Sequence, residues 1–265
     1  MANEKAILVR YGEVWLKSES VRHRFAQTLV DNIRVLFPRK TKISAIPGRI
    51  WVYCDSIPAE LKRVFGIVSF SPVIICDKST EAMTAAATPI VSKWKSGTFA
   101  IRARRSDKSF PLTSKQLEIA LANLVDLPVD LSSPEHELCV EIRDKAYLYD
   151  KTIAGPGGLP LGTAGKVAAK LRDDDDLAAA WLVMKRGALP ILIKPSSALL
   201  RTLQRWSIGK KLRAAKSLKE AAKLGAIALV DARSKRPKAG GLATLNPLAG
   251  FSAAEKAQLL KKIRA

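Results

Sequence analysis

Cysteine and histidine are scarce in this sequence of 265 residues, which holds three cysteines and two histidines. The cysteines, Cys54, Cys76 and Cys139, stand far apart, and none belongs to a Cys-x-x-Cys pair. A zinc cluster or a disulfide framework needs such residues at short, repeated spacings, so the sequence supports neither. We expect the three thiols to lie among apolar side chains.

Long apolar runs are also missing. No stretch approaches the roughly 20 consecutive apolar residues of a membrane-spanning helix, and the first five residues, Met-Ala-Asn-Glu-Lys, lack the apolar core of a signal peptide. We therefore exclude membrane insertion and expect a cytoplasmic location and no membrane partner, with binding to an anionic membrane surface as the alternative.

Acidic residues are the third shortage. The chain has 24 Asp and Glu against 45 Lys and Arg, a formal net charge of +21, while 48% of its residues are apolar. The apolar content is sufficient for a folded core in two or three small domains. The charge makes a polyanion the expected partner, with nucleic acid and an anionic membrane surface as the two rivals.

Most of this imbalance lies in the last third of the chain. Residues 163–265 hold 22 basic and 7 acidic residues, whereas residues 1–57 hold 10 and 5, and residues 58–162 hold 13 and 12. Lys210, Lys211 and Arg213 belong to one dense basic cluster, and residues 233–238 form another. A lysine-rich solvated surface is the alternative, but such surfaces usually balance Lys with Glu. The pattern favours polyanion binding.

Hydrophobic periodicity in the first part predicts a strand, a helix, two strands, a helix and a strand. The predicted ranges are 6–11, 20–37, 42–45, 50–54, 58–65 and 68–76. This is the ferredoxin-like order. A second alternating block follows, with helices at 81–95 and 114–124, a strand at 99–105 and a hairpin at 137–153.

The last third alternates again, which predicts a mainly parallel, doubly wound sheet with helices on its faces. The predicted strands are 167–171, 190–194 and 226–230, and the predicted helices are 175–186, 197–215, 218–224 and 253–263. The glycine and proline run at 154–163 reads as a linker. The same loop could instead cradle a phosphate with its backbone N–H groups.

Four strings occur in a set order: Arg-Tyr-Gly-Glu-Val-Trp-Leu-Lys at 10–17, Phe-Ala-Ile-Arg-Ala-Arg-Arg at 99–105, Gly-Gly-Leu-Pro-Leu-Gly-Thr at 157–163, and Ala-Ala-Trp-Leu-Val-Met-Lys-Arg-Gly at 179–187. In these strings the chain resembles the tRNA sulfurtransferases that make 4-thiouridine. The resemblance implies an α/β protein with an α+β N-terminal half. Its expected domains are a ferredoxin-like domain (1–57), a THUMP domain with its linker (58–162) and a basic domain related to PP-loop adenylating domains (163–265).

The resemblance also implies which residues contact tRNA. In that family the first two domains grip tRNA near its acceptor end, which implies phosphate contacts for Arg102, Arg104, Arg105 and Lys108. Lys17 and Arg10 are further candidates, and from the basic third we add Lys210, Lys211 and Arg213. Arg102 and Arg104 are two apart on a predicted strand, so they share a face, and guanidinium forks suit phosphate oxygens. Pairing with acids of the same domain is the alternative.

The sequence departs from the family pattern at the position of the ATP-binding loop. Working members carry Ser-Gly-Gly-x-Asp-Ser, whose glycines let backbone amides approach the phosphates. This chain has Arg172 followed by Asp173, Asp174, Asp175 and Asp176. Four carboxylates would repel a triphosphate, so we expect neither ATP nor Mg²⁺ as a cofactor. Acids at a helix start cap its N–H groups, and a metal site is the alternative.

Two further departures agree. Residues 163–265 contain no cysteine to carry a persulfide, and they are few for an adenylating domain. We therefore predict a non-catalytic relative, a tRNA-binding adaptor that delivers tRNA to a separate modifying enzyme. Two alternatives stay open: an active ATP-dependent uridine thiolation enzyme that uses Asp175 or Asp176 and a partner sulfur carrier, and a general RNA-binding component of a ribonucleoprotein.

Overall fold

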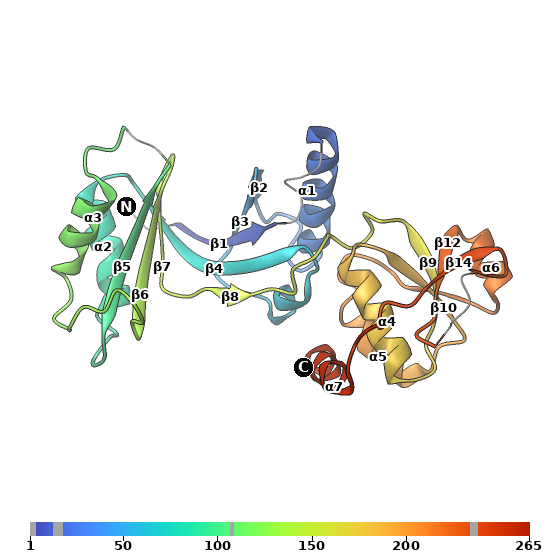
Figure 1. Ribbon diagram of the computed structural model, residues 1–265. Coiled ribbons are helices and arrows are strands. Elements are labelled where there is room, and N and C mark those ends of the chain that lie inside the picture. The colour runs from blue at the N-terminus through green and yellow to red at the C-terminus, as the bar shows by residue number, and fades with distance from the viewer. Residues whose placement is uncertain (1–3, 13–17, 107–108, 234–237) are drawn as a thin grey trace.

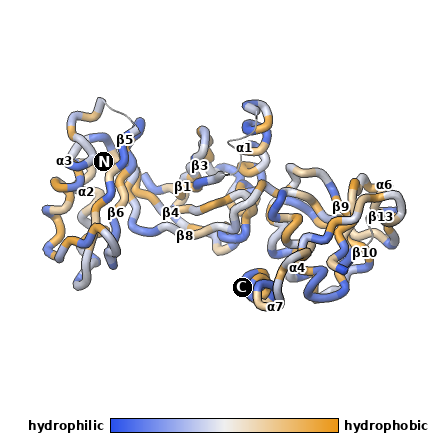
Figure 2. Tube along the Cα trace, viewed as in Figure 1, coloured by the Kyte–Doolittle hydropathy of each residue, from blue (hydrophilic) through white to orange (hydrophobic). Residues whose placement is uncertain are grey.

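The computed structural model describes residues 4–12, 18–106, 109–233 and 238–265, which form two sheets with helices packed on them (Figure 1). The α/β class predicted from the sequence is confirmed. Hydrophobic residues follow the strands and the helices that cover them (Figure 2). None of the helices in the described part of the chain has the length and apolar content to cross a bilayer.

The first unit has the predicted ferredoxin-like order. It comprises β1 (Glu4–Tyr11), α1 (Glu19–Arg34), β2 (Ile43–Ile46), β3 (Arg49–Tyr53), the 3₁₀ helix η1 (Ala59–Arg63) and β4 (Ile67–Cys76). Side chains alternate across β1: Ile7 and Val9 pack with α1, while Ala6 and Leu8 face the other side. On α1, Phe25, Leu29 and Ile33 are buried at helical spacing.

The THUMP unit continues the same sheet. It comprises α2 (Thr80–Val91), β5 (Phe99–Arg105), α3 (Ser114–Ala122), β6 (His136–Ile142), β7 (Ala146–Tyr149) and the short β8 (Ile153–Ala154). The strand order is β2-β3-β1-β4-β7-β6-β5, with β8 paired to β4. Strand β4 pairs with β1 and with β7, so it runs through both units (Figure 1). The boundary at residue 57 stays a prediction.

The last unit is the predicted parallel sheet. Its elements are β9 (Lys166–Lys170), α4 (Asp174–Lys185), β10 (Leu189–Ile193), α5 (Ser197–Gln204), β11 (Arg213–Ala215), α6 (Leu218–Lys223), β12 (Ala226–Val230), β13 (Lys238–Ala239), β14 (Leu242–Leu245) and α7 (Ala253–Arg264). The order is β11-β10-β9-β12-β14-β13, with only β13 antiparallel within the described residues. Helices α4, α5 and α7 pack on one core and α6 on the other.

One predicted element is wrong. The expected helix at 197–215 ends at Gln204, and β11 occupies its last part. Trp206 then enters the core, where it is 5% exposed and donates from Nε1 to the carbonyl of Ile263 at 2.9 Å. Gly209 follows with φ +77°, where an added Cβ would lie 2.6 Å from Asn32. A helix could not continue through that conformation.

The glycine and proline run at 154–163 connects the two sheets. Its amides donate to backbone carbonyls of the flanking units at 2.8–2.9 Å; these are the amides of Gly155, Gly157, Leu159 and Gly162. Asn32 of α1 also donates from Nδ2 to the carbonyl of Leu161 at 3.1 Å. Because these amides are already used within the protein, the loop has the contacts of a linker.

Candidate RNA-binding site

Arg102 and Arg104 share one face of the edge strand β5, as the spacing predicts. Ile101 and Ala103 point into the core beneath α2 and α3, while Arg102 is half-buried and Arg104 is exposed. Arg102 donates from Nε to Glu137 at 3.1 Å and from Nη2 to the carbonyl of Leu131 at 2.5 Å. The alternative to RNA contact, pairing within the same domain, thus applies to Arg102.

Arg105 lies on the opposite face from Arg104 and stabilises the loop before α3. Its Nη1 donates to the carbonyls of Phe110 and Leu112 at 2.9 and 2.6 Å. A guanidinium held in this way supports the backbone of the THUMP unit. Lys108 and Lys17, two other predicted contacts, lie outside the described residues.

Arg10 is largely enclosed, with 15% of its side chain exposed. Nη1 donates to the Ser71 hydroxyl at 2.9 Å, Nη2 lies 3.5 Å from Glu141, and the guanidinium stands 4.6 Å from the centre of the Tyr149 ring. This environment joins β1 of the first unit to β6 and β7 of the THUMP unit.

The basic cluster of the last third does not lie on one helix. Lys210 and Lys211 fall in the loop after α5, and Arg213 begins β11. Lys211 and Arg213 are exposed, and the stem of Lys210 runs beside Gly162 of the linker. These side chains are therefore presented by a loop and a strand end. The structure does not bring them together with Arg104 on one element.

The acidic turn at residues 172–176 joins β9 to α4. Asp173 is the N-cap of α4, and its side chain accepts from the amide of Asp176 at 3.1 Å. The capping interpretation is therefore confirmed, with Asp173 in that role. Within the described residues no group of three or more potential ligands is placed to hold a metal ion.

Every carboxylate of the acidic turn contacts a cation of the same chain. Asp173 contacts Arg233, Asp174 contacts Arg264 at 2.5 Å, Asp175 contacts Lys256 at 3.0 Å, and Asp176 contacts Arg172 at 2.6 Å. The hydrogen bond with Asp176 is the largest cause of a raised pKa for Arg172. One cation belongs to the turn itself, two belong to α7 and one belongs to the segment after β12. Ion pairs therefore connect the turn to α7 and to that segment.

Asp231, just after β12, extends this network. It accepts from Lys170 at 2.7 Å and from Arg172 at 2.8 Å. Burial alone would raise the pKa of Asp231, but the hydrogen bonds from Lys170, the Arg233 amide and Arg172 outweigh it and hold this pKa below its ordinary value. The carboxyl end of the sheet, where open α/β sheets bind ligands, is thus occupied by internal ion pairs.

The pKa of each of the three thiols is raised above its ordinary value. Burial is the main cause of a raised pKa for each of them, and it brings the pKa of Cys76 and of Cys139 to about 11. A thiol with such a pKa holds little thiolate at neutral pH. As predicted, apolar surroundings account for Cys76, which is buried in the core of the THUMP unit.

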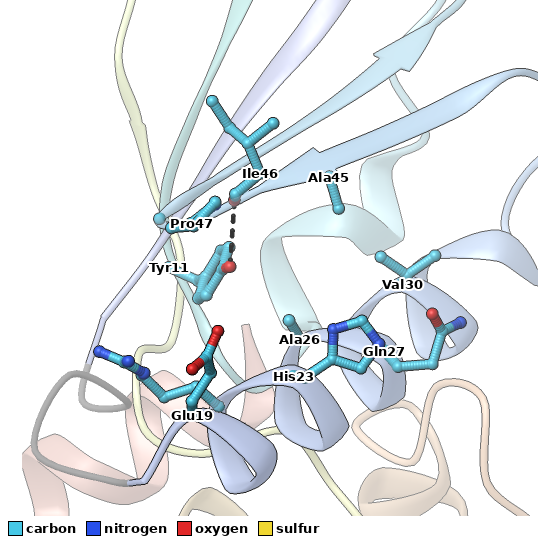
Figure 3. Close-up of a pocket in the computed structure, with 11 residues that line it drawn as sticks. Tyr11, Glu19, His23, Ala26, Gln27, Val30, Ala45, Ile46 and Pro47 are labelled. Carbon is cyan, nitrogen blue, oxygen red and sulfur yellow. Dashed lines mark hydrogen bonds between the residues drawn. The ribbon is translucent and has the colours of Figure 1, made fainter.

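A hollow of about 380 Å³ lies between α1 and the β2–β3 turn. Figure 3 shows Glu19 and His23 of α1 facing Tyr11 and Ile46, and the Tyr11 hydroxyl donates to the Ile46 carbonyl at 3.2 Å. The hollow is on the α1 side of the sheet, whereas Arg10 and Arg104 belong to the other side.

Sequence reasoning missed the residues that surround Arg10. Arg49 and Arg143 both approach Glu141, at 3.7 and 3.6 Å, and Glu141 is only 7% exposed. No local pattern marks them, because they come from β3, β6 and the turn after β6. The one available signal was an acid, Glu141, at a strand position flanked by buried apolar residues.

The comparisons with known proteins match the first two units. Residues 6–71 match the family described as "ThiI ferredoxin-like domain", and residues 77–150 match the THUMP domain. The chain is therefore a THUMP-domain protein with a ferredoxin-like unit before the THUMP fold. The chain is also similar to proteins named tRNA sulfurtransferase, in agreement with its sequence resemblance.

Curated relatives match about two thirds of the chain. A "Probable tRNA sulfurtransferase" of Caldanaerobacter subterraneus subsp. tengcongensis is 38% identical in an alignment of length 193 that covers 68% of this chain and 50% of the relative. One from Mycoplasmopsis synoviae is 40% identical in an alignment of length 190 that covers 69% of this chain and 50% of the relative. The chain thus spans about half the length of the curated relatives it matches.

Solved structures share the whole fold. The crystal structure of PH1313 from Pyrococcus horikoshii Ot3 superposes with a TM-score of 0.83 at 28% identity, covering 98% of this chain and 100% of that one. A 4-thiouridine synthetase in complex with RNA and ATP superposes with a TM-score of 0.82 at 23% identity, covering 98% of this chain and 85% of that one. The second likeness concerns the fold alone.

Proposed function

We propose that this protein binds tRNA through its ferredoxin-like and THUMP units and serves tRNA modification without adenylating the RNA itself. The observation that carries the second part is the acidic turn, whose four carboxylates are each paired with a cation of the chain. A triphosphate at this turn would have to displace these pairs and would meet four negative charges.

Binding of tRNA is supported by the family, by the charge of +21 and by the exposed arginine on β5. Arg104 is the foremost contact in this proposal, because Arg102 and Arg105 already donate to groups of the THUMP unit. Lys210, Lys211 and Arg213 extend the basic surface, and a separate modifying enzyme would receive the tRNA.

A second candidate is an active, ATP-dependent uridine thiolation enzyme that takes sulfur from a partner. It is favoured by the retained strand β9, turn and helix α4 of a parallel sheet, and by relatives whose name is tRNA sulfurtransferase. In that case Asp175 or Asp176 would be the acid of the nucleotide site. Asp176 is 1% exposed and bound to Arg172, which speaks against this role.

The test is tRNA-dependent conversion of ATP to AMP and pyrophosphate with Mg²⁺, beside a binding titration with the same tRNA. Our proposal expects saturable tRNA binding and no turnover. Turnover would establish the second candidate. Equal competition by unrelated duplex RNA would instead indicate a general RNA-binding component of a ribonucleoprotein.

A charge reversal tests the contact on β5. Arg104→Glu should weaken tRNA binding by at least about tenfold, since it replaces an attractive phosphate contact by a repulsive one. Lys93→Glu is the matched control, because Lys93 is an exposed lysine in the connection between α2 and β5 and is not part of β5. Equal affinities for the two variants would remove Arg104 from the proposed site.

A further inference from the structure

A cluster of arginines lies on the face of the first sheet opposite α1. We use the name arginine cluster for Arg10, Arg49 and Arg143 together with Glu141, the carboxylate that they surround. Arg10 of β1 is the direct neighbour of Arg49 on β3, and Glu141 of β6 is the direct neighbour of Arg104 on β5. Strands of the ferredoxin-like unit and of the THUMP unit thus meet at this cluster, and Arg104 flanks it.

The charges of the arginine cluster do not balance. Three guanidinium groups surround one buried carboxylate, at 3.5 Å for Arg10, 3.7 Å for Arg49 and 3.6 Å for Arg143. Another nearby carboxylate, Asp144, accepts from the Tyr147 hydroxyl and makes no ion pair with these arginines within the described residues. Two positive charges are therefore left uncompensated in a largely enclosed site.

Hydrogen bonding is also incomplete. The Nη2 of Arg10 and the Nε atoms of Arg49 and Arg143 are inaccessible to solvent and have no hydrogen-bond acceptor among the described residues. Their contacts with Glu141 are Coulombic, whereas the Tyr149 hydroxyl donates to that carboxylate at 3.2 Å. These three nitrogen atoms are the ones that face Glu141, so the buried carboxylate is their electrostatic partner, and the case for a second anion rests on the excess of positive charge.

We infer that the arginine cluster is a binding site for one phosphate group. The three side chains are 15–25% exposed, so the site opens to solvent. A phosphate offers acceptor oxygens and carries one negative charge as an RNA diester or up to two as the free ion, which suits the excess positive charge of the guanidinium groups. Glu141 would then position the guanidinium groups. The phosphate of an RNA backbone and a free phosphate share this chemistry; the RNA source rests on the proposed function.

Inorganic phosphate is the first probe. At constant ionic strength, with chloride as the replacement, phosphate should raise the melting temperature of the wild-type protein saturably, and titration calorimetry should give one site. Arg143→Gln should weaken this binding by at least about tenfold, the loss expected for one charge-assisted hydrogen bond. Arg24→Gln, an exposed position on α1, should leave it unchanged.

Glu141→Gln separates a phosphate site from a purely structural ion cluster. The substitution adds one net positive charge to the cluster, so it should tighten phosphate binding, and phosphate should restore the stability that the variant loses. If Glu141→Gln is destabilised and phosphate does no more than chloride, or if the wild-type protein shows no phosphate-specific effect, the inference is overturned.

A tRNA titration with the same variants identifies the source. If an RNA phosphate occupies the cluster, Arg143→Gln binds tRNA more weakly than Arg24→Gln does. The slope of log K against log salt is then lower by about 0.7–0.9 for Arg143→Gln. Unchanged tRNA affinity beside abolished phosphate binding supports a site for a free phosphate. If the wild-type protein binds phosphate but does not bind tRNA, the inference of a phosphate site stands and the proposed function is wrong.

Discussion

Asp176 and Asp174 both belong to the acidic turn but have different surroundings. Asp176 is 1% exposed and accepts from the Arg172 amide and guanidinium, whereas Asp174 is 45% exposed and pairs with Arg264, itself 52% exposed. Asp176→Asn should lower the free energy of unfolding by about 1–3 kcal/mol, because it leaves donors poorly satisfied. Asp174→Asn should cost less than about 1 kcal/mol. Urea titration of both variants tests the contrast, and equal costs would contradict it.

Asp231 makes stability depend on pH in the acid range. Its pKa is held below the ordinary value in the folded protein by Lys170, the Arg233 amide and Arg172, against the effect of burial. The resulting stabilisation is fully present above the unfolded-state pKa of about 3.9 and is lost as pH falls through the folded pKa.

Asp231→Asn should therefore be less stable than wild type at pH 7 and should lose less stability between pH 6 and pH 3. The measurement is the urea midpoint across this range. Asp126→Asn, at an exposed position in the THUMP unit, is the control and should follow the wild-type curve. A parallel loss in Asp231→Asn and wild type would mean that this carboxyl does not govern the acid limb.

Two adjacent glycines of the linker give a matched test at the scale of elements. Gly157 and Gly158 have φ values of +68° and +78°; a Cβ on Gly157 would meet nothing within 4 Å, whereas one on Gly158 would lie 2.1 Å from the Lys185 carbonyl at the end of α4. Gly157→Ala should cost about 1–2 kcal/mol for the left-handed conformation.

Gly158→Ala should cost about 1–3 kcal/mol more than Gly157→Ala, because the clash pushes the linker away from α4. Thermal unfolding of the two variants gives the difference. Equal melting temperatures would show that α4 and the linker can separate without cost, and that the contact between the two sheets is looser than the hydrogen bonds at 2.8–2.9 Å indicate.

Elements with a clear apolar period could be predicted from the sequence, and those decided by distant contacts could not. The spacing of Phe25, Leu29 and Ile33 predicts α1, and the acids at the start of α4 predict its capping. The helix expected at 197–215 failed because Trp206 is anchored to Ile263 of α7 and Gly209 packs on Asn32 of α1. Neither partner is visible in the local sequence.

At the scale of the whole molecule, the candidate site could be predicted only where one strand carries it. The shared face of Arg102 and Arg104 follows from strand periodicity, and the run of four acids at 173–176 can be read directly from the sequence. The arginine cluster could not be predicted, because β1, β3 and β6 bring Arg10, Arg49 and Glu141 together across more than 130 residues of chain.

The charge of the last unit leads to a prediction about the whole molecule. If the loop after α5 extends the RNA-binding surface, Lys210→Gln/Lys211→Gln should weaken tRNA binding and reduce the slope of log K against log salt by about 0.7–0.9 for each phosphate that the variant no longer neutralises. Lys93→Gln/Lys95→Gln removes the same charge from exposed positions between α2 and β5 of the THUMP unit and should change neither quantity. Fluorescence anisotropy across a KCl series provides the slopes. An equal, small effect in both double variants would mean that long-range attraction alone operates and that the last unit does not touch the RNA.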